Sequence, residues 1–434
     1  MKGIVKLQDG NKGVVFKIIN DDDTEEVIKL QAENSARAIV GTAMLKKAGA
    51  NAPNIRAVKG TEYTDLEQEV GNFIQQAQLN GDVTSLGVAQ QLAGCLQKAR
   101  DPNSDYNYRN VVRMDYASGL ALDKAWKNDP QKFKAMMTNP EFHKQLGQIM
   151  AGDAYGGNGD RFVGRRTGKQ MEGGAEKITG WFNPGNIIIE GEGKDLKLKA
   201  IDNDLVPGRN LLTDSVFGYG NFYAQGGSVA AANTQQLKRE VFAIAQKMEE
   251  LSGVKLSPQE LYDFIENTTK GAKQSMDVML KSEFTPEHVS GMLHENGESF
   301  ERALELGTDF ASHRQLVHML ANDTEEHGVK VQPSVKQMLG IAKEKTELTT
   351  EKVLKGLGLP DDVVKEITAK RENLDEFNKL NNPLEQERFT KLMQGERGAH
   401  VPKDFKLTVK EAALLAKDES TYKQFTHKPG GNKV

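Results

Sequence analysis

The first 30 residues alternate between hydrophobic and polar positions with a period of two, which is typical of β-strands. Hydrophobic positions alternate in this way over 4–7, 14–19 and 27–30. The intervening residues 9–13 and 20–23 are rich in Asp, Asn and Gly, which favour turns. This pattern predicts a three-stranded antiparallel meander.

A helical period follows the meander. Hydrophobic positions recur every three or four residues over 35–48, and the pattern stops at Gly49, so we predict one amphipathic helix. A further strand is predicted at 53–58, a Gln-rich helical region at 66–100, and another strand at 109–116, just before Ser118 and Gly119. The N-terminal part is therefore expected to be a small sheet with one or two helices.

Helical periodicity dominates beyond Leu120, with a short hairpin predicted at 186–190 and 196–201. The expected helices lie at 120–127, 130–137, 140–151, 234–252, 257–270, 271–283, 285–293, 297–305 and 311–321, followed by a charged helical block at 333–425. We expect an α+β chain of three parts: 1–117, β-rich; 118–325, mainly helical; and 326–434, a charged helical extension.

Composition narrows the possible partners. Lys and Arg number 57 against 61 Asp and Glu, a formal charge of −4, so no net positive field attracts nucleic acid. Cys95 is the one cysteine and can close no intrachain disulfide, which favours a reducing, cytoplasmic compartment. No apolar run approaches the roughly 20 residues that cross a bilayer, so no transmembrane segment is expected.

The meander carries the first candidate for phosphate chemistry. Gly10 and Gly13 enclose the turn between its first two strands, and Lys29 lies in the third. Glycines let backbone N–H groups approach phosphate oxygens, and a lysine on a strand supplies a fixed positive charge. An ordinary hairpin with a solvated lysine would have the same sequence.

The second candidate is the segment 153–161, which closes a helix and is dense in carboxylate and amide groups. Asp160 has the chemistry of a catalytic base that orients an attacking hydroxyl, with Asn158 and Arg161 bracing it. A solvated turn is the alternative. A calcium loop is disfavoured because the carboxylates do not fall at alternating positions.

The third candidate is an apolar strand that ends in a carboxylate, Asp202. The end of a strand can present such a group to Mg²⁺, and Asn186, after an Asn-Pro-Gly turn, would offer an amide oxygen to the same metal. Either element could instead be a surface hairpin. Between them, 163–184 forms a Gly-rich insertion, and Arg161, Arg165, Arg166 and Lys169 could form a cluster that binds an acidic group, or could simply be solvated.

These motifs carry a resemblance. Asp153 to Arg161 resembles the D-x-x-x-x-N-x-D-R signature of type II phosphatidylinositol 4-kinases, and Ala200-Ile201-Asp202-Asn203 resembles their A-I-D-N signature. Similar pairs occur in the wider phosphatidylinositol 3-/4-kinase superfamily and in bacterial protein kinases of the persistence-toxin type. The resemblance extends from Ile4 to Pro207 and implies a bilobal, protein-kinase-like fold.

The resemblance assigns roles to individual residues. It makes Lys29 the ATP-phosphate lysine, Asp160 the catalytic base, and Asp202 and Asn186 the Mg²⁺ ligands, with Asn158 and Arg161 bracing the loop. It places the phosphates under the Gly10–Gly13 turn and adenine near Met114 and Tyr116, at the hinge between lobes.

Two departures from the family pattern stand out. The family's metal-binding Asn follows the catalytic Asp within a few residues, whereas here Asn186 lies beyond the insertion. The helix after the third strand lacks a central acidic residue, which leaves Glu33 as the candidate partner of Lys29.

The resemblance implies an ATP- and Mg²⁺-dependent kinase acting on a hydroxyl. A protein Ser or Thr is the first candidate acceptor, because the chain has neither a cysteine-rich palmitoylation segment nor a basic amphipathic helix for a membrane surface. A phosphoinositide is the alternative acceptor. Two other readings stay open: nucleotidyl or glutamyl transfer on the same fold, and a kinase-like scaffold with a helical binding platform. Such a chain would also fit a bacterial effector kinase with a role in virulence, delivered into a host cell.

Overall fold

The computed structural model describes residues 1–10, 13–32, 34–101, 110–158, 161, 165–166, 178–179, 183–205, 234–322, 348–398, 400–402 and 405–427. The chain divides into two compact units. The first comprises Met1–Lys247 and Asp263–Val329, and the second comprises Met248–Tyr262 and Lys330–Val434.

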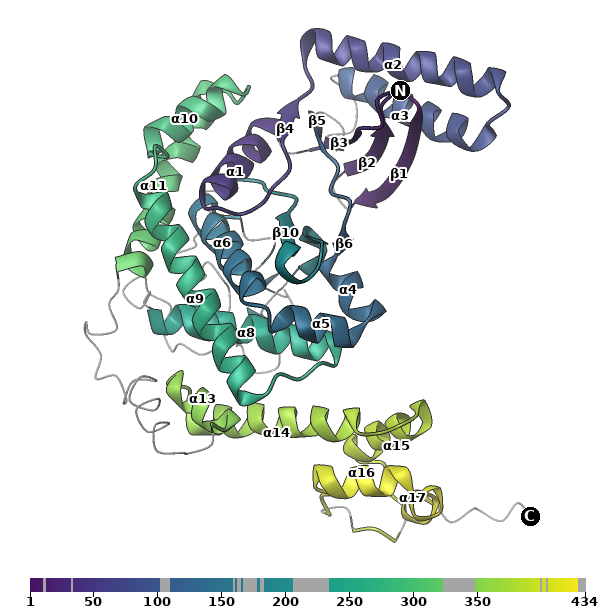
Figure 1. The fold of residues 1–434 in the computed structure, drawn as a ribbon, viewed down its shortest axis with the longest axis vertical. Helices are drawn as coiled ribbons and strands as arrows, with labels where there is room; N and C mark the ends of the chain where they lie inside the picture. Colours follow the sequence, from purple (N-terminus) through teal and green to yellow (C-terminus); the bar gives the residue numbers. More distant parts are fainter. Residues whose placement is uncertain are drawn as a thin grey trace. The chain divides into compact units, whose positions relative to one another are not determined.

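The first unit begins with a five-stranded antiparallel sheet in the order β1-β2-β3-β5-β4 (Figure 1). Its strands are β1 (Gly3–Gly10), β2 (Gly13–Ile19), β3 (Glu25–Gln31), β4 (Ile55–Ala57) and β5 (Asn110–Asp115). The predicted meander is confirmed, because β1, β2 and β3 are neighbours in chain order. A β-bulge between Lys6 and Gln8 interrupts the β1–β2 register.

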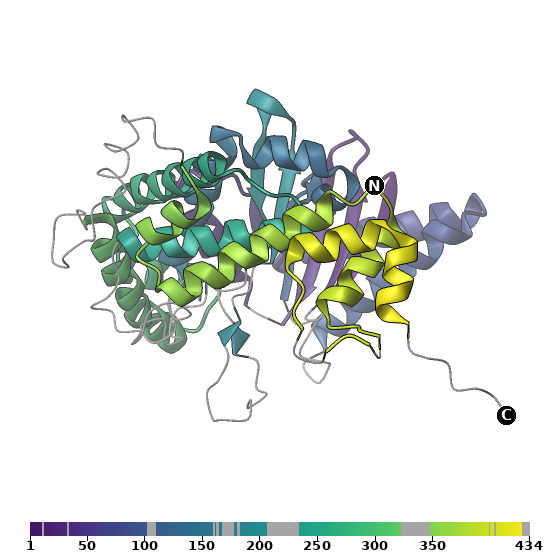
Figure 2. The same cartoon turned by 90° about the horizontal axis from the view of Figure 1, so that it is seen from below.

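A helical pair covers one face of this sheet: α2 (Gly60–Leu79) and α3 (Val83–Arg100), visible beside the strands in Figures 1 and 2. Both helices share a core with alternate residues of the strands: Val14, Phe16, Ile18, Ile28, Leu30, Leu66, Val70, Leu92, Leu96 and Val111. The region predicted as helical over 66–100 is thus two helices. Gly81 adopts φ +68° in the turn, and Asp82 caps α3 by accepting from the Ser85 N–H.

The strand period places the intervening residues on the opposite face of the sheet. Phe16 and Ile28 belong to the core against α2 and α3, so Lys29, the next residue of β3, lies on the other face. Its cross-strand partners there are Val15 and Val112. On this face Val15 and Lys29 are half-buried, whereas Val112 is fully buried.

Helix α1 (Ser35–Lys47) follows β3 and agrees with the helix predicted at 35–48. Asn34 caps it by accepting from the Ala36 N–H at 2.9 Å. The helix packs on α6 (Pro140–Gly156), where Gly152 leaves room for Leu45: a Cβ on Gly152 would lie 2.6 Å from the Leu45 side chain. The close approach of α1 and α6 therefore depends on that glycine.

The rest of the first unit is mainly helical. A three-stranded sheet of order β10-β9-β6 joins β6 (Leu120–Ala121), β9 (Ile187–Glu190) and β10 (Lys197–Ala200), which confirms the predicted hairpin. The other elements are α4 (Leu122–Asn128), α5 (Pro130–Met137), a two-stranded pair β7 (Arg165–Arg166) and β8 (Ile178–Thr179), the 3₁₀ turns η2 (Pro184–Asn186) and η3 (Gly193–Asp195), α8 (Thr234–Ser252), α9 (Pro258–Leu280), α10 (Pro286–Glu295) and α11 (Phe300–Asn322).

Two of these helices correct the sequence-based boundaries. The separate helices expected at 257–270 and 271–283 are one helix, α9, and those at 297–305 and 311–321 are one helix, α11. In each of these two helices a glycine lies where a neighbouring helix approaches closely. A Cβ on Gly271 would lie 3.0 Å from the Lys144 carbonyl oxygen of α6, and one on Gly307 would lie 2.7 Å from the Pro286 carbonyl oxygen of α10.

The second unit is helical. It contains the junction of α8 and α9 with α13 (Thr350–Gly356), α14 (Asp361–Asn378), α15 (Pro383–Met393), α16 (Val409–Lys417) and α17 (Glu419–Thr426). Glu249 and Arg371 form a buried ion pair, and the Arg371 guanidinium also donates to the Leu256 carbonyl at 2.6 Å. Burial raises the pKa of Glu249 to about 7, against the opposite pull of Arg371.

The observed architecture is a small antiparallel sheet with a mostly helical remainder, so the α+β class is confirmed. Among the described helices, none is both long and apolar enough to cross a membrane.

Candidate functional site

The candidate site centres on Ile201 and Asp202, the two residues that follow β10. Three of their backbone groups are held by residues from the other candidate motifs. The Ile201 N–H donates to the Asn186 carbonyl at 3.1 Å. The Ile201 carbonyl accepts from Arg161 Nη1 at 2.5 Å, and the Asp202 carbonyl accepts from Asn158 Nδ2 at 3.2 Å. The structure therefore brings the second and third motifs together.

Asp202 has an unusual backbone conformation. Its φ is +61°, in the left-handed region, and among the described non-glycine residues only Asp23 also has a positive φ. This conformation costs free energy for a residue with a Cβ and persists where neighbouring contacts hold it. The three backbone hydrogen bonds at Ile201 and Asp202 supply that constraint.

Lys29 forms an ion pair with Asp202. The Lys29 ammonium on β3 donates to Asp202 Oδ1, so two residues 173 positions apart in sequence meet. Their side chains remain 20% and 36% exposed. The first motif therefore joins the other two. The candidate partner Glu33 lies outside the described residues, and the first turn of α1 contains no acidic residue.

A second ion pair lies beneath this segment. Arg161 donates to both carboxylate oxygens of Asp153, through Nε at 2.7 Å and Nη2 at 2.5 Å, and the two side chains are 0% and 2% exposed. The prediction that the loop begins at Asp153 was wrong, and the alternative of a solvated turn does not fit two buried side chains. Helix α6 runs on to Gly156, which makes Asp153 helical and buried, and Gly157 ends it at φ +70°. Arg161 consequently does not belong to an exposed basic cluster.

Helix α1 packs against the segment that follows Asp202. Asn203 Nδ2 donates to the Thr42 hydroxyl at 3.3 Å, and the Leu205 N–H donates to the Arg37 carbonyl at 3.1 Å. A Cβ on Gly41 would lie 2.0 Å from the Asn203 carbonyl oxygen. Only glycine permits this approach, so α1 and the Asp202 segment are fixed to each other.

The remaining predicted residues lie around this centre or outside the described residues. Asn186 ends η2, and its carbonyl contacts Ile201 as described above. Gly10 and Gly13 pair with each other at the end of the β1–β2 hairpin, and a Cβ on Gly13 would lie 2.1 Å from the Leu30 carbonyl oxygen. Asp160, the predicted base, lies outside the described residues, as do Lys169 and most of 163–184.

The residues predicted at the hinge between lobes, Met114 and Tyr116, lie near the end of β5 and just after it. Met114 lies on β5, opposite Val27 and Ile55. The Tyr116 N–H donates to the Glu25 carbonyl at 3.2 Å, and the Lys17 ammonium lies 4.5 Å from the centre of the Tyr116 ring. Both residues are partly exposed, on or just after the strand that neighbours β3.

One positioning residue was missed at the sequence level. Gln145 on α6 is buried; its Oε1 accepts from the Leu198 N–H at 2.7 Å, and its Nε2 donates to the Leu196 carbonyl at 2.8 Å. It thereby anchors β10, the strand that leads to Asp202. The sequence signal that could have identified Gln145 is its place next to the hydrophobic Leu146, on the buried side of the helix.

The contacts bring a carboxylate and an ammonium group together at Asp202 and Lys29. A carboxylate is an oxygen ligand of the kind that Mg²⁺ prefers, and an ammonium group suits phosphate oxygens. For Asn186 the contact described is that of its backbone carbonyl. No cluster of three or more His, Cys, Asp or Glu side chains suited to a metal occurs in the described part of the chain.

The chain resembles several solved structures, among them a protein kinase domain. No protein-family model matches the chain, and no curated protein matches it. Among solved structures, the crystal structure of the maize sucrose-induced receptor kinase 1 kinase domain bound to AMP-PNP is similar, with a TM-score of 0.27 and 13% sequence identity. The match covers 73% of this chain and 93% of that chain. Because this TM-score is low, the function is argued from the side chains alone.

Proposed function

We propose that the chain is an ATP- and Mg²⁺-dependent phosphotransferase with a bilobal, kinase-like arrangement, in which 1–117 and 118–325 form the two lobes. The observation that carries the proposal is the convergence on one segment of Lys29, Asp202, Asn158, Arg161 and the backbone of Asn186. The motif order along the chain and this contact set are independent of each other, and both suit phosphoryl transfer.

The chain's residues would divide the work as follows. Lys29 holds positive charge where phosphate oxygens would lie, and the Asp202 carboxylate with the Asn186 amide would hold the metal. Mg²⁺·ATP, when bound, supplies the transferable γ-phosphoryl group and neutralises its charge. Asp160 is the proposed base for the acceptor hydroxyl. Arg161 acts only as a positioning residue, because its guanidinium is committed to Asp153 and to the Ile201 carbonyl.

We propose that this site would open to a ligand by separation of the ion pair between Lys29 and Asp202. Both groups remain partly exposed, and their attraction is weak in contact with water. A phosphate would offer Lys29 a more highly charged partner, and the freed carboxylate would accept the metal. Catalysis would then come mainly from positioning and charge neutralisation.

We propose a protein Ser or Thr hydroxyl as the acceptor, with a phosphoinositide as the alternative. The test is incubation of the full chain with γ-labelled ATP and Mg²⁺, alone, with cell lysate, and with phosphoinositide vesicles. Label should appear on protein and should be lost in Asp202→Asn and Lys29→Met. Label on lipid would identify the alternative acceptor.

Two matched controls separate the site from general charge effects. Lys17→Met removes a lysine that lies on the same face of the sheet and pairs with Glu25 at 2.7 Å. Asp195→Asn removes an exposed carboxylate from η3. Both controls should retain transfer. Nucleotide binding without label on any acceptor would contradict the proposed reaction.

A further inference from the structure

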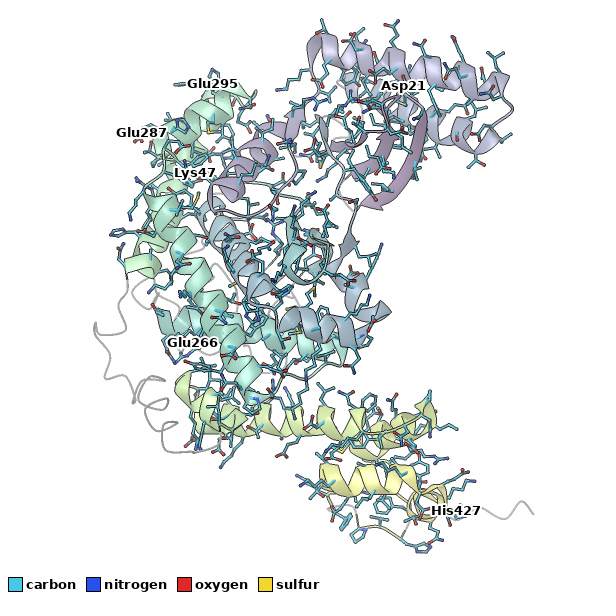
Figure 3. All side chains as sticks on the ribbon, viewed as in Figure 1. Asp21, Lys47, Glu266, Glu287, Glu295 and His427 are labelled. Carbon is cyan, nitrogen blue, oxygen red and sulfur yellow. The ribbon has the colours of Figure 1, made fainter. Side chains whose placement is uncertain are left out.

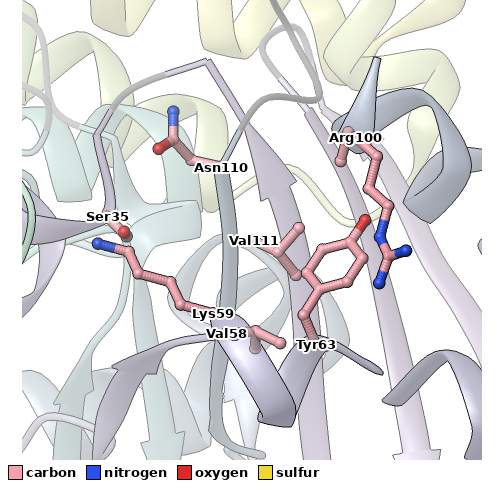
Figure 4. A pocket seen from close by; sticks show the side chains of 9 residues that line it. Ser35, Val58, Lys59, Tyr63, Arg100, Asn110 and Val111 are labelled. Atoms are coloured by element: carbon pink, nitrogen blue, oxygen red, sulfur yellow. The ribbon is translucent and has the colours of Figure 1, made fainter. Parts of the chain in front are cut away.

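A pocket lies in the first unit at the start of β5, where Asn110 and Val111 line it. Its volume is about 410 Å³, within the range of small-molecule sites. Val111, which lines it, belongs to the core against α2 and α3, whereas its neighbour Val112 pairs with Lys29 on the other face. The polar lining consists of Ser35, Lys59, Gly60, Tyr63, Arg100 and Asn110 (Figure 4).

The pocket is electropositive. Ser35 and Gly60 are the first residues of α1 and α2, so two helix N-termini line it. Backbone N–H groups at helix N-termini attract anions. Lys59 adds a full charge: its ammonium donates to the neutral Asn296 carbonyl at 2.7 Å, and no carboxylate pairs with it in the described part of the chain. A positive group with only a neutral partner is well placed to bind an anion.

Ser35 provides the independent sign of a ligand. The residue is only 1% exposed and lines the pocket, and its hydroxyl has no hydrogen-bond partner among the described residues. Figure 4 shows Ser35 and Lys59 among the side chains that line the pocket. A hydroxyl that lines a pocket and bonds to no other described group can donate a hydrogen bond to a ligand oxygen or accept one from it.

The remaining wall is apolar and rigid. Val58 and Val111 belong to the buried core, and the Tyr63 hydroxyl donates to the Leu96 carbonyl. Burial raises the pKa of Tyr63 to about 12, so its ring stays neutral. Arg100 covers that ring at 5.0 Å and pairs with Glu67, which commits most of its charge elsewhere. The anion-binding end is therefore the one at Lys59 and Ser35.

We propose that this pocket binds a small phosphorylated molecule, with its phosphate at Lys59 and Ser35 and its organic part against Val58 and Val111. The site is separate from the one that contains Lys29. The ligand binds in this pocket without transfer of any group to or from it.

The test uses phenyl phosphate, which carries a phosphate and an apolar ring, and inorganic phosphate, which lacks the ring. Each is titrated into the full chain by calorimetry at constant ionic strength. Phenyl phosphate should bind more tightly than phosphate. Lys59→Gln and Ser35→Ala should each weaken it about tenfold, the usual loss of one hydrogen bond to a charged group.

Two further variants identify the site. Lys46→Gln removes an exposed lysine that also donates to a neutral oxygen, Asn54 Oδ1 at 2.5 Å, and should leave the affinity unchanged. Lys29→Met should leave it unchanged as well. Loss of binding in Lys29→Met with retention in Lys59→Gln would place the ligand in the other site and overturn the proposal. So would the absence of saturable binding, or equal affinities in all four variants.

Discussion

Two ion pairs adjoin the Ile201–Asp202 segment, and they differ in burial and in geometry. Arg161 and Asp153 are almost completely buried, make two hydrogen bonds to each other, and add a third to the Ile201 carbonyl. Lys29 and Asp202 are joined by a hydrogen bond from the Lys29 ammonium to Asp202 Oδ1 and remain partly exposed. Two neighbouring pairs of the same charge type therefore have different physical roles.

The difference in burial distinguishes an ion pair that supports the backbone from one that can respond to a ligand. A buried pair with every donor engaged cannot release a charge to a ligand without leaving its partner unsatisfied. A partly exposed pair contributes little to stability and can exchange its partner. The buried pair thus holds the backbone next to Asp202, and under the proposed function the exposed pair would provide the charges for a ligand. Four variants test this comparison, in order of the expected change in the free energy of unfolding.

The largest change is expected from Arg161→Met, which leaves the Asp153 carboxylate buried and unpaired. Breaking a buried pair in this way costs about 3–5 kcal/mol. Urea denaturation followed by circular dichroism measures it. In the double variant Asp153→Leu/Arg161→Met no lone charge remains, and part of the loss should return. If Arg161→Met is as stable as the unmodified chain, the supporting role is wrong.

Acidification should lower the free energy of unfolding through His313, a buried residue of α11. Phe310, one turn earlier on α11, packs edge-on against Tyr155 of α6 at 5.0 Å between ring centres. Burial lowers the pKa of His313 to about 4 from 6.5, so the fold binds the neutral ring and loses stability as the pH falls from 6.5 to 4. The loss is about 3 kcal/mol at most.

The measurement is urea denaturation at pH 7, 5 and 4, with His313→Leu alongside the unmodified chain. Carboxylates titrate in both proteins, so their difference isolates the histidine. The unmodified chain should lose stability relative to the variant on acidification. Parallel curves would show that His313 is accessible to protons in the fold.

Much of the fold could be predicted from the sequence. Period-two alternation identified β1, β2 and β3, and the helical period identified α1, because those signals are local. The breaks predicted after 270 and after 305 were wrong, because α9 and α11 continue through them. Gly271 and Gly307 lie near these breaks, and each sits at a contact with a neighbouring helix. A sequence shows that a glycine is present but does not show what approaches it.

The site was predictable in part for the same reason. The motifs pointed to Lys29 and Asp202, but their pairing across 173 positions and the positive φ of Asp202 are properties of the folded chain. Asp153 and Arg161 are buried although both are charged, and charged residues are usually exposed. Charged residues near a Gly-rich segment usually indicate a solvated loop, and only the three-dimensional arrangement shows that each of the two neutralises the other.

Gly41→Ala should have an intermediate effect, because its methyl group would collide with the Asn203 carbonyl. Relief requires α1 or the Asp202 segment to move, at a cost of about 1–3 kcal/mol. Gly94→Ala in α3 is the matched control, since nothing lies within 4 Å of its Cβ position, and it should stabilise slightly. Thermal unfolding of both variants measures the difference. Equal effects would show that α1 is not fixed by this contact.

The smallest change in stability is expected from Lys29→Met, which removes the exposed pair. We expect less than about 1 kcal/mol in urea denaturation, because an ion pair in contact with water contributes little. The same variant should abolish the rise in melting temperature that Mg²⁺·ATP produces in the unmodified chain, since a ligand stabilises only a protein that binds it. Lys17→Met should keep that rise.

For Lys29→Met we therefore expect the free energy of unfolding to be retained and the rise in melting temperature with Mg²⁺·ATP to be lost. For Arg161→Met we expect both to decrease, because that variant removes the support of the site as a whole. A large loss of stability in Lys29→Met would show that its pair with Asp202 is structural. The two ion pairs would then have the same role, and the nucleotide site would have to be sought elsewhere in the chain.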